Sequence, residues 1–490
     1  MAEQFDVVIV GAGISGIGMA AHLARQCPGK SYAILDRRAQ PGGTWDLFRY
    51  PGIRSDSDIH TFAYKFAPWR DDNTVVSGEQ IRDYLNRVIG EHDIGPHLRF
   101  GQHVRHANWD SAAALWRIEA EQADGSVREV LGKFVVMGTG YYDYDAPYDP
   151  QIPGLADFRG SVIHPQFWPE GFDHAGKNVV VIGSGATAVT LIPALAQSAA
   201  HVTMLQRTPT WYGVRPSVDK SANLLRRIMP EKWAYAINRF RAQKLHDWLF
   251  KKARSSPEGF AKVLTGQIKG ELGEHWTERD FTPPYKPWEQ RLCLVPDGDL
   301  FAAIREGRAG VVTGTIKRVI AGGIELDDGT VIEADVIITA TGLALATLGK
   351  ISLSIDDAPV NLSDRYWYRN CLFSNVPNLA AIFGYLNAGW TLRVDLVADY
   401  LCRLINQMDA WRADAVMPEL PEDHDLVEFQ PVDMFTSGYL QRGKHIIPKS
   451  ATTAPWRLQM FHFDDKREFA AVPVDDGWLK IVRRRARAAA

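Results

Sequence analysis

The chain has 490 residues, which is long for a single hydrophobic core and predicts about three domain-sized units. Its 46% hydrophobic and 23% charged residues are those of a soluble globular protein, and a net charge of −3 excludes a general attraction to nucleic acid. The cysteines (Cys27, Cys293, Cys371 and Cys402) have neither a C-x-x-C nor a metal-ligand spacing, so we expect reduced thiols in a cytoplasmic protein with no metal site.

The first motif is a glycine-rich turn between a predicted strand and a predicted helix. The apolar run at 6–10 is typical of a central parallel strand and leads into Gly11-Ala-Gly13-Ile-Ser15-Gly16. Asp36 follows Gly16 by 20 residues, at the end of the next apolar run. Glycines in this context let backbone N–H groups approach a pyrophosphate, and the acid accepts hydrogen bonds from a ribose. The sequence therefore predicts a dinucleotide-binding fold; the alternative is a tight turn without a ligand.

A segment dense in glycine, proline and charge follows over residues 42–58. It shows no helix or strand period, and functional side chains are often carried by such loops. Its candidate site residues are Gly43, Thr44, Trp45, Arg54 and Asp56. The alternative is a solvated loop with helix-capping acids.

Two distant segments share one plan. Residues 116–140 contain a strand, an Asp-Gly turn and a second strand that ends in Thr-Gly, and residues 323–342 repeat this order. Each Asp-Gly predicts a hairpin turn. The repeat indicates two nucleotide-binding units built alike.

Residues 158–169 lie between the two glycine-rich turns and have neither a helix nor a strand period. We interpret them as a linker that turns at Gly160 and stops at Pro169, with Phe158, His164 and Trp168 at fixed offsets. An ordinary buried contact of a linker is the alternative.

The second glycine-rich turn is Gly183-Ser184-Gly185-Ala186-Thr187-Ala188, after an apolar run at 178–182. Alanine at the third glycine position still allows close helix packing. The next predicted strand ends in Gln206-Arg207-Thr208 instead of an acid. An arginine there can bind a 2′-phosphate through two hydrogen bonds, so the sequence predicts NADPH over NADH. An arginine without a ligand is the alternative.

Residues 219–256 differ in character from the rest. Apolar residues recur at helical spacing, and Pro230 separates two predicted helices. The segment contains ten Lys and Arg residues and three acidic residues, which gives it a net charge of +7. Two interpretations stay open: contact with an anionic membrane surface, or an inserted helical lobe with a solvated face.

Several of these runs resemble a known family. The pattern F-x-G-x-x-x-H-x-x-x-W-P at 158–169 is similar to the fingerprint of type I Baeyer–Villiger monooxygenases, which are class B flavoprotein monooxygenases. Residues 43–56, 181–190 and 290–301 are similar to the ethionamide-activating group of these enzymes. The resemblance implies an α/β fold with two Rossmann-like dinucleotide-binding domains and a helical insertion, with FAD on the first domain and NADPH/NADP⁺ on the second. The predicted division is 1–148 and 331–490 for FAD, 149–218 and 286–330 for NADPH, and 219–285 for the insertion.

The resemblance also implies roles for single residues. Arg291 falls on the active-site arginine of the family and Asp56 on its aspartate, and the turn at 384–391 falls where the family has a turn against the flavin. Gln290 stands where the family often has lysine, so Arg207 would bear more of the phosphate recognition. An ordinary salt bridge is the alternative for Arg291. The predicted cofactor-binding residues are Gly11, Gly13, Ser15, Gly16, Asp36, Gly43, Thr44, Trp45, Arg54, Asp56, Val104, Gly140, Gly183, Ser184, Gly185, Ala186, Thr187, Ala188, Arg207 and Thr208.

The implied reaction converts a ketone and O₂ into an ester or lactone through a C4a-peroxyflavin, with sulfoxidation as a related activity. Its partners are a small ketone or sulfide and O₂, and no nucleic acid. Three rivals share parts of the pattern: a flavin monooxygenase that oxidises nitrogen or sulfur, a pyridine-nucleotide:disulfide reductase, and a flavin-binding scaffold without turnover. The reductase needs a redox-active cysteine pair, and no cysteines are spaced for one.

Overall fold

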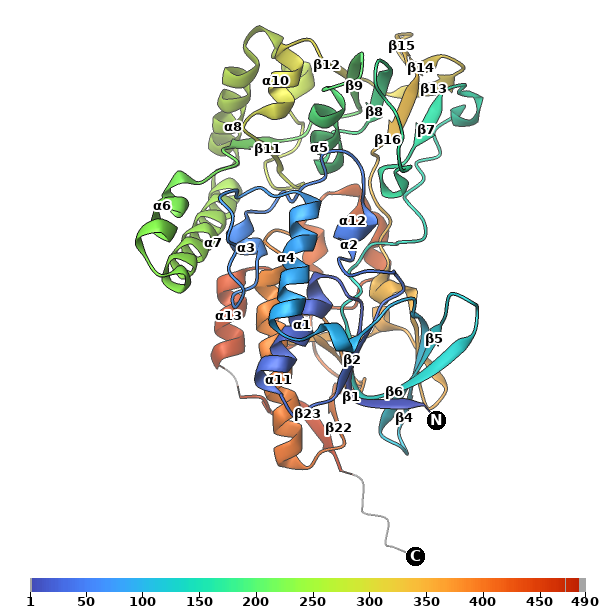
Figure 1. Ribbon diagram of the computed structural model, residues 1–490, viewed down its shortest axis with the longest axis vertical. Coiled ribbons are helices and arrows are strands. Elements are labelled where there is room, and N and C mark those ends of the chain that lie inside the picture. Colours follow the sequence, from blue (N-terminus) through green and yellow to red (C-terminus); the bar gives the residue numbers. More distant parts are fainter. Residues whose placement is uncertain (1, 472, 484–490) are drawn as a thin grey trace, which may run out of the picture.

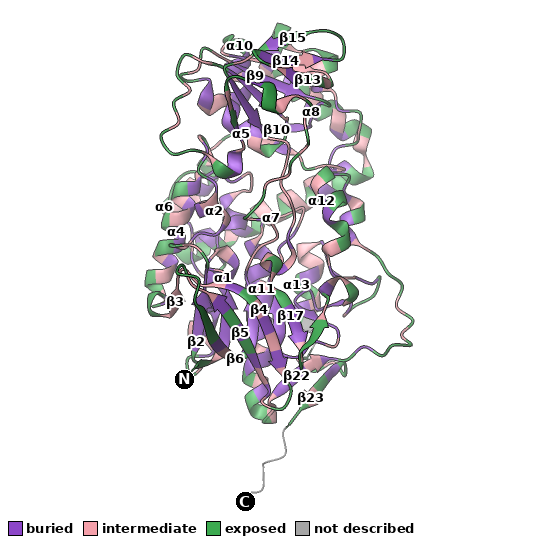
Figure 2. Ribbon diagram, turned by 90° about the vertical axis from the view of Figure 1, so that its right-hand side faces the viewer, coloured by how far each residue is buried: buried purple, intermediate pink, exposed green. Residues whose placement is uncertain are grey.

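The computed structural model describes residues 2–471 and 473–483. Two separate sheets organise the chain, a mixed sheet with a parallel core in the lower half of the molecule and a parallel sheet in the upper half (Figure 1). Helices cover both sheets, and the strands are the most buried parts of the chain (Figure 2). This mixed α/β architecture with two nucleotide-type sheets confirms the predicted fold class.

The lower sheet is centred on β1 (Glu3–Val10), whose residues Val7, Val8 and Ile9 are completely buried. Because such a strand is buried on both faces of the sheet, its sequence is a continuous apolar run. Its parallel core has the order β3-β2-β1-β6-β21. The other strands of this core are β2 (Tyr32–Leu35), β3 (Leu98–Arg99), β6 (Val127–Met137) and β21 (Leu379–Ala381). Helices α1 (Ile14–Gln26), α4 (Gly78–Glu91) and α11 (Thr391–Trp411) pack together in this half.

The upper sheet repeats this order around β8 (Asn178–Ile182), as β12-β9-β8-β16-β7. Its other strands are β7 (Ser161–Ile163), β9 (His201–Gln206), β12 (Ala309–Thr313) and β16 (Val336–Thr339). An antiparallel meander precedes the fourth strand in both halves: β4 (His103–Asp110) and β5 (Leu115–Glu121) before β6, and β13 (Ile316–Ile320), β14 (Gly323–Leu326) and β15 (Val331–Glu333) before β16. The shared strand order agrees with the duplication that the sequence indicates.

The fingerprint segment is more regular than a linker. Residues Ser161–Ile163 form the edge strand β7, which pairs in parallel with β16, and a single 3-10 turn (Pro165–Phe167) follows. A three-residue strand is too short to show a period, which is why the sequence pattern missed it. Glycine is required at position 160 because the backbone of Asp335 lies close to it: a Cβ there would lie 2.3 Å from the carbonyl oxygen of Asp335.

Residues 219–256 contain two helices separated at Pro230, as predicted, and further helices follow up to residue 281. They are α6 (Lys220–Ile228), α7 (Glu231–Ser255), α8 (Pro257–Leu272) and α9 (Glu278–Phe281). The side chain of Asp219 caps α6 by accepting from the backbone N–H groups of Ser221 and Ala222, and Pro230 begins α7. Among the described residues, no helix combines the length and the apolar character needed to cross a bilayer.

The chain passes from the lower to the upper half after β6 and returns after β16. These two connections pair with each other: the N–H of Asp143 donates to the oxygen of Ala344 (2.9 Å), and that of Ala346 donates to the oxygen of Tyr141 (3.0 Å). We call residues 141–143 and 344–346 the crossover ribbon. An ion pair between Arg215 and Asp58 (2.7 Å) adds a further contact between the halves.

The remaining elements are α2 (Thr44–Leu47), α3 (Ile59–Phe62), α5 (Ala186–Leu195), α10 (Asp299–Arg305), α12 (Gly438–Gly443), α13 (His462–Ala471), β10 (Tyr212–Arg215), β11 (Cys293–Pro296), β17 (Ser352–Ile355), β18 (Ala358–Val360), β19 (Trp367–Tyr368), β20 (Leu372–Phe373), β22 (Ala415–Pro418) and β23 (Leu479–Val482).

Candidate cofactor and active site

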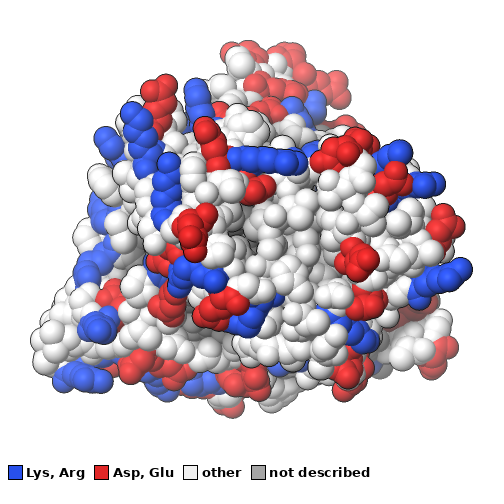
Figure 3. All heavy atoms as spheres, turned by 90° about the horizontal axis from the view of Figure 1, so that it is seen from above, with Lys and Arg blue, Asp and Glu red and all other residues white. Residues whose placement is uncertain are grey.

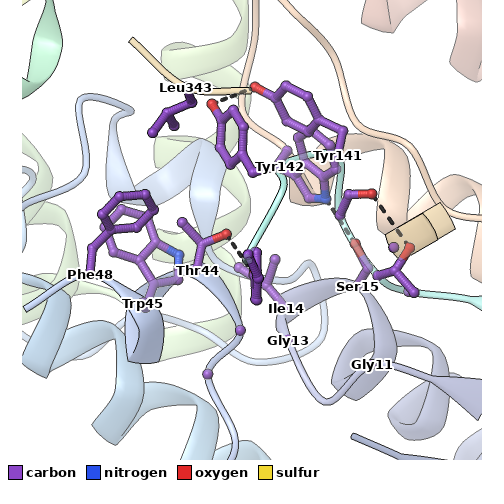
Figure 4. Close-up of a pocket in the computed structure, with 18 of the residues that line it drawn as sticks. Gly11, Gly13, Ile14, Ser15, Thr44, Trp45, Phe48, Tyr141, Tyr142 and Leu343 are labelled. Atoms are coloured by element: carbon purple, nitrogen blue, oxygen red, sulfur yellow. Dashed lines mark hydrogen bonds between the residues drawn. The ribbon is translucent and has the colours of Figure 1, made fainter. Parts of the chain in front are cut away.

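A cavity of about 310 Å³ lies where the two halves meet. Its wall combines the glycine turn after β1, the loop at 42–58 and the crossover ribbon (Figure 4), together with the start of α5. The structure brings these predicted residues into its lining: Gly11, Gly13, Ser15, Asp36, Gly43, Thr44, Trp45, Arg54, Asp56, Val104, Gly140, Ala186, Thr187 and Arg291. Residues from both predicted nucleotide units therefore face one space.

The first glycine turn is built by close backbone approach. Gly11 has φ +106°, and a Cβ there would lie 2.7 Å from the oxygen of Gly138. Gly16 does not line the cavity; a Cβ on it would collide with the oxygen of Gly11, so it serves the packing of α1. The turn directs the N-terminus of α1 at the cavity, the arrangement that binds a pyrophosphate.

Asp36 directly follows β2 and is 8% exposed. One carboxylate oxygen accepts from the N–H of Ala12 (2.6 Å) and the other from the N–H of Arg38 (2.8 Å). Burial raises the pKa of this carboxyl, while the two N–H donors act against the rise. Asp36 thus fixes the glycine turn and also presents its remaining lone pairs to the cavity.

The predicted irregular loop at 42–58 contains one helical turn, α2, which begins after Gly43 at φ +56°. Asp46 anchors it from the buried side, with Arg38, Arg49 and Gln40 as partners. The hydroxyl of Thr44 bonds that of Tyr144 (3.1 Å). These contacts hold Trp45 and Thr44 in the cavity wall (Figure 4).

Arg291 and Asp56 form an ion pair across the junction of the halves, with 2.8 Å between Nη2 and Oδ1. Their side chains are 44% and 27% exposed, and both line the cavity. The Asp56 carboxylate raises the pKa of the Arg291 guanidinium and outweighs the opposing effect of burial. The pair therefore presents a permanently charged, oriented donor to the cavity.

The second glycine turn repeats the first in its backbone. Gly183 has φ +129°, and a Cβ there would lie 2.4 Å from the oxygen of Ala340, whereas a Cβ on Gly185 would meet no protein atom within 4 Å. Ala188 lies in the first turn of α5 and is completely buried. The Ser184 hydroxyl is engaged by Thr210 (2.8 Å).

Arg207 and Thr208 follow β9 and are exposed. They do not line the cavity, nor do Gly183, Ser184, Gly185 and Ala188. From the second unit, α5 reaches it at Ala186, Thr187 and Thr190, and the segment before β11 reaches it at Arg291. The predicted 2′-phosphate residues thus lie at the outer end of the second unit.

The fingerprint residues lie behind the cavity. His164 Nδ1 accepts from the N–H of Gln166 (3.1 Å), its Nε2 is buried, and burial lowers the pKa of the ring against the opposing effect of the Gly342 backbone. Gln166 donates to the oxygen of Asp143 in the crossover ribbon (2.8 Å). Trp168 packs against Phe172, and Phe158 lies in the core of the upper half. The segment therefore contacts the ribbon and not the cavity.

Sequence reasoning missed several lining residues. Tyr141 and Tyr142 join their hydroxyls at 2.8 Å on the ribbon (Figure 4), and the Tyr141 ring stacks on Trp390 at 5.2 Å. Their position directly after a strand that ends in Thr-Gly was an available signal. Lys350, which pairs with Asp143, carries no such signal. The turn at 384–391 does lie against the cavity, through Tyr385, Ala388 and Trp390.

A buried ionic cluster supports that turn. Arg393 and Asp465 are both completely buried and paired, with 3.0 Å between Nε and Oδ2. The hydroxyl of Tyr385 donates to the same carboxylate, and the Arg393 guanidinium lies 4.0 Å from the centre of the Tyr385 ring. Tyr385, which lies in the cavity wall, is thus held in place by an ion pair that is buried from solvent.

The four cysteines are buried, and none lines the cavity. Within residues 2–471 and 473–483, no three His, Cys, Asp or Glu side chains gather in a group that could hold a metal ion.

The structure has two glycine turns of the dinucleotide-binding type, on two similar sheets that share one cavity. This arrangement defines the class of two-dinucleotide-binding-domain flavoproteins. A family model described as pyridine nucleotide-disulphide oxidoreductase matches residues 8–237. The chain is 46% identical over 488 residues to the FAD-containing monooxygenase EthA of Mycolicibacterium smegmatis, covering 99% of both chains. It is 44% identical to a probable FAD-binding monooxygenase, AlmA, of an Acinetobacter species, covering 99% of this chain and 97% of the relative. The chain belongs to this family of FAD-containing monooxygenases.

Solved structures show the same fold at lower identity. Cyclohexanone monooxygenase bound to epsilon-caprolactone superposes with a TM-score of 0.77 at 21% identity, covering 98% of this chain and all of the other. Cyclohexanone monooxygenase from Rhodococcus sp. Phi1, bound to NADP⁺, gives 0.75 at 22% identity, covering 99% and 100%. The resemblance to flavoprotein monooxygenases is confirmed.

Proposed function

We propose that the protein is an FAD- and NADPH-dependent Baeyer–Villiger monooxygenase that inserts one oxygen atom of O₂ into a ketone to give an ester or lactone. The observation that supports this most is the single cavity onto which the first glycine turn, the start of α5 and the Arg291–Asp56 pair all open. When bound, FAD and NADPH would supply the reducing equivalents and the oxygen-activating ring.

The residues present fit an FAD. The N-terminus of α1 faces the cavity at Gly13 and Ser15, and Asp36 presents a carboxylate at the end of β2. These groups would hold the pyrophosphate and a ribose. Trp45, Tyr141 and Trp390 supply flat apolar surfaces in the same wall and would exclude water from the reacting centre.

The second unit fits NADPH. Gly185 leaves open space beside the N-terminus of α5, and Arg207 is exposed at the end of β9, where no acid would repel a 2′-phosphate. The domain division that follows is 1–148 with 331–490 for FAD, 149–218 with 286–330 for NADPH, and 219–285 as a helical insertion.

Arg291 would stabilise negative charge that develops on oxygen in the cavity, because its guanidinium stays protonated and its donors have a fixed geometry. Asp56 would hold that guanidinium in place at 2.8 Å. Gln166, which bonds the ribbon, and His164, which accepts from the N–H of Gln166, would couple movements of the two halves.

The purified protein with NADPH, O₂ and a panel of ketones and sulfides tests the reaction, with products identified by mass spectrometry. Ester or lactone formation is expected. Sulfoxides or N-oxides without any ester would favour the alternative, a flavin monooxygenase that oxidises sulfur or nitrogen. A bound flavin that NADPH does not bleach without O₂ would favour a scaffold without turnover.

A matched pair of glycine variants tests the nucleotide site without turnover. Gly185→Ala meets no protein atom within 4 Å, so the folded protein and its melting temperature should be unchanged while the affinity for NADP⁺ falls. Gly183→Ala has its Cβ 2.4 Å from a backbone oxygen and should destabilise the fold itself. Unchanged NADP⁺ binding by Gly185→Ala, measured by calorimetry, would contradict the assignment.

A further inference from the structure

Helices α6 and α7 carry an unusual number of exposed large apolar side chains. Of the fifteen such side chains in the described part of the chain, six lie on these two helices, each at least 54% exposed. They are Leu224, Ile228, Trp233, Phe240, Leu245 and Trp248. We call this set the lobe face.

Helix α7 exposes large apolar side chains on one side. Trp233, Phe240 and Trp248 lie 7 and 8 residues apart, so they share one side of the helix, and that side is exposed. The side that faces the protein buries Asn238 and Arg239, at 2% and 7% exposure, together with Ala234, Tyr235, Phe250 and Ala253. Arg239 is neutralised there by Asp395 at 2.8 Å. Helix α7 therefore carries large apolar groups on its outer side in addition to those that it buries.

The lobe face is framed by positive charge. In residues 219–256 the three acids are already engaged: Asp219 caps α6, Glu231 pairs with Arg70 (3.0 Å) and Asp247 with Lys251 (2.9 Å). The exposed bases are Lys220, Arg227, Lys232, Arg241, Lys244, Lys251, Lys252 and Arg254. Blue side chains lie along the left margin of Figure 3, the side on which Figure 1 draws α6 and α7. This local charge contrasts with the −3 of the whole chain.

We propose that the lobe face docks on the surface of a bilayer that contains anionic phospholipid. Tryptophan and phenylalanine would enter the boundary between headgroups and acyl chains, and the flanking lysines and arginines would lie at the phosphates. The axial rise from Trp233 to Trp248 spans about 22 Å, so α7 would lie in the plane of the membrane surface. The charge of the lobe face favours a lipid surface over a protein partner. The cores of protein–protein interfaces are depleted of lysine, whereas here lysines alternate with the aromatic residues along one helix.

The small cavity on the inner side of α7 connects this face to the site. His246 of α7 contacts the oxygen of Asn387 and lines that cavity together with Ala388. Ala388 also lines the main cavity. The docked helix would therefore lie between the lipid surface and the turn that walls the site.

Vesicle co-sedimentation of the full-length, FAD-loaded protein tests the proposal. We compare vesicles of phosphatidylcholine alone with vesicles in which part of it is replaced by phosphatidylglycerol. Binding to the anionic vesicles is expected, and it should weaken as salt is added. The triple variant Trp233→Ser, Phe240→Ser, Trp248→Ser should lose roughly tenfold or more in affinity, and each of Lys232→Gln, Lys244→Gln and Lys252→Gln about fivefold.

The matched control replaces equally exposed apolar residues elsewhere: Val127→Ser, Val331→Ser and Val427→Ser, which are 65%, 51% and 65% exposed. This control should bind vesicles as the parent does, and all variants should keep their flavin content and NADPH oxidation rate. If the triple variant does not fold, Trp233→Ser and Trp248→Ser singly carry the test.

Three outcomes would overturn the proposal: no binding to anionic vesicles, equal loss in the valine control, or binding to phosphatidylcholine alone that salt does not change. Self-association in size-exclusion chromatography that the triple variant abolishes, without vesicle binding, would assign the lobe face to a second copy of the chain instead.

Discussion

Arg291→Ala separates the chemistry of the cavity from its architecture. The guanidinium lines the cavity and is held by Asp56 at 2.8 Å. Removing one preorganised donor of this kind costs about 10²–10³ in rate, or roughly 3–4 kcal/mol. Because the two side chains are 44% and 27% exposed, losing their ion pair should cost only about 0–1 kcal/mol of folding free energy.

The assay measures ester formed and H₂O₂ released per NADPH consumed. We expect the Arg291→Ala protein to keep its flavin and to consume NADPH while ester formation falls by about the factor above and H₂O₂ replaces it. Arg291→Lys keeps the positive charge but loses the rigid planar guanidinium, so its ester formation should lie between that of the parent and that of Arg291→Ala. Asp56→Asn should show the same uncoupling more weakly, because the guanidinium remains but is held less firmly.

Arg318→Ala is the matched control, since Arg318 is exposed on β13, pairs with Glu325 and does not line the cavity. It should leave the ester yield unchanged. An unchanged yield per NADPH in folded Arg291→Ala would refute the role assigned to this arginine. Loss of bound flavin in that variant would refute it too, and would point to cofactor retention.

Arg207→Ala should narrow the preference for NADPH over NADH by roughly tenfold or more, because a hydrogen bond to a charged group is worth about 1.5–3 kcal/mol; kcat/KM with NADH serves as the reference, and an unchanged ratio would contradict the assignment. Asp465→Asn leaves buried Arg393 without its counter-charge and should cost about 3–5 kcal/mol of unfolding free energy. The exposed neighbour Asp464→Asn should cost less than about 1 kcal/mol in the same denaturant titration, and equal costs would refute the reasoning. Burial lowers the pKa of His462 from 6.5 to about 3, so the folded state favours the neutral ring and its stability declines as the pH falls from 6.5 towards 3. His462→Asn should flatten that decline, and an unaltered pH profile of unfolding would show that another group causes it.

The glycine turns and the duplicated plan could be predicted because their signals are local. A strand, a glycine turn and an acid within one short segment define the first unit, and Asp-Gly followed by Thr-Gly marks the meander in each half. The helical insertion was predictable for the same reason: Pro230 and the apolar spacing lie within one stretch. The pairing of Arg291 with Asp56, 235 residues away, rested on the family resemblance alone.

Other features depend on tertiary contacts that no local pattern records. Arg239 and Arg393 look like surface residues in sequence, yet both are buried because Asp395 and Asp465 neutralise them. Lys350 reaches the cavity wall only because the return connection pairs with the outgoing one. The choice between a solvated lobe and a membrane surface at 219–256 likewise required knowing which side of α7 faces outward.

The crossover ribbon limits how the two halves of the molecule can move. A single connecting strand would permit swivelling about its own axis, but two antiparallel strands joined at Tyr141–Ala346 and Asp143–Ala344 resist torsion and yield mainly by bending. Since both strands also line the cavity, any such flexing changes the volume available beside the cofactor. Gln166, bonded to the ribbon at Asp143, lies where it would stiffen or release that bend.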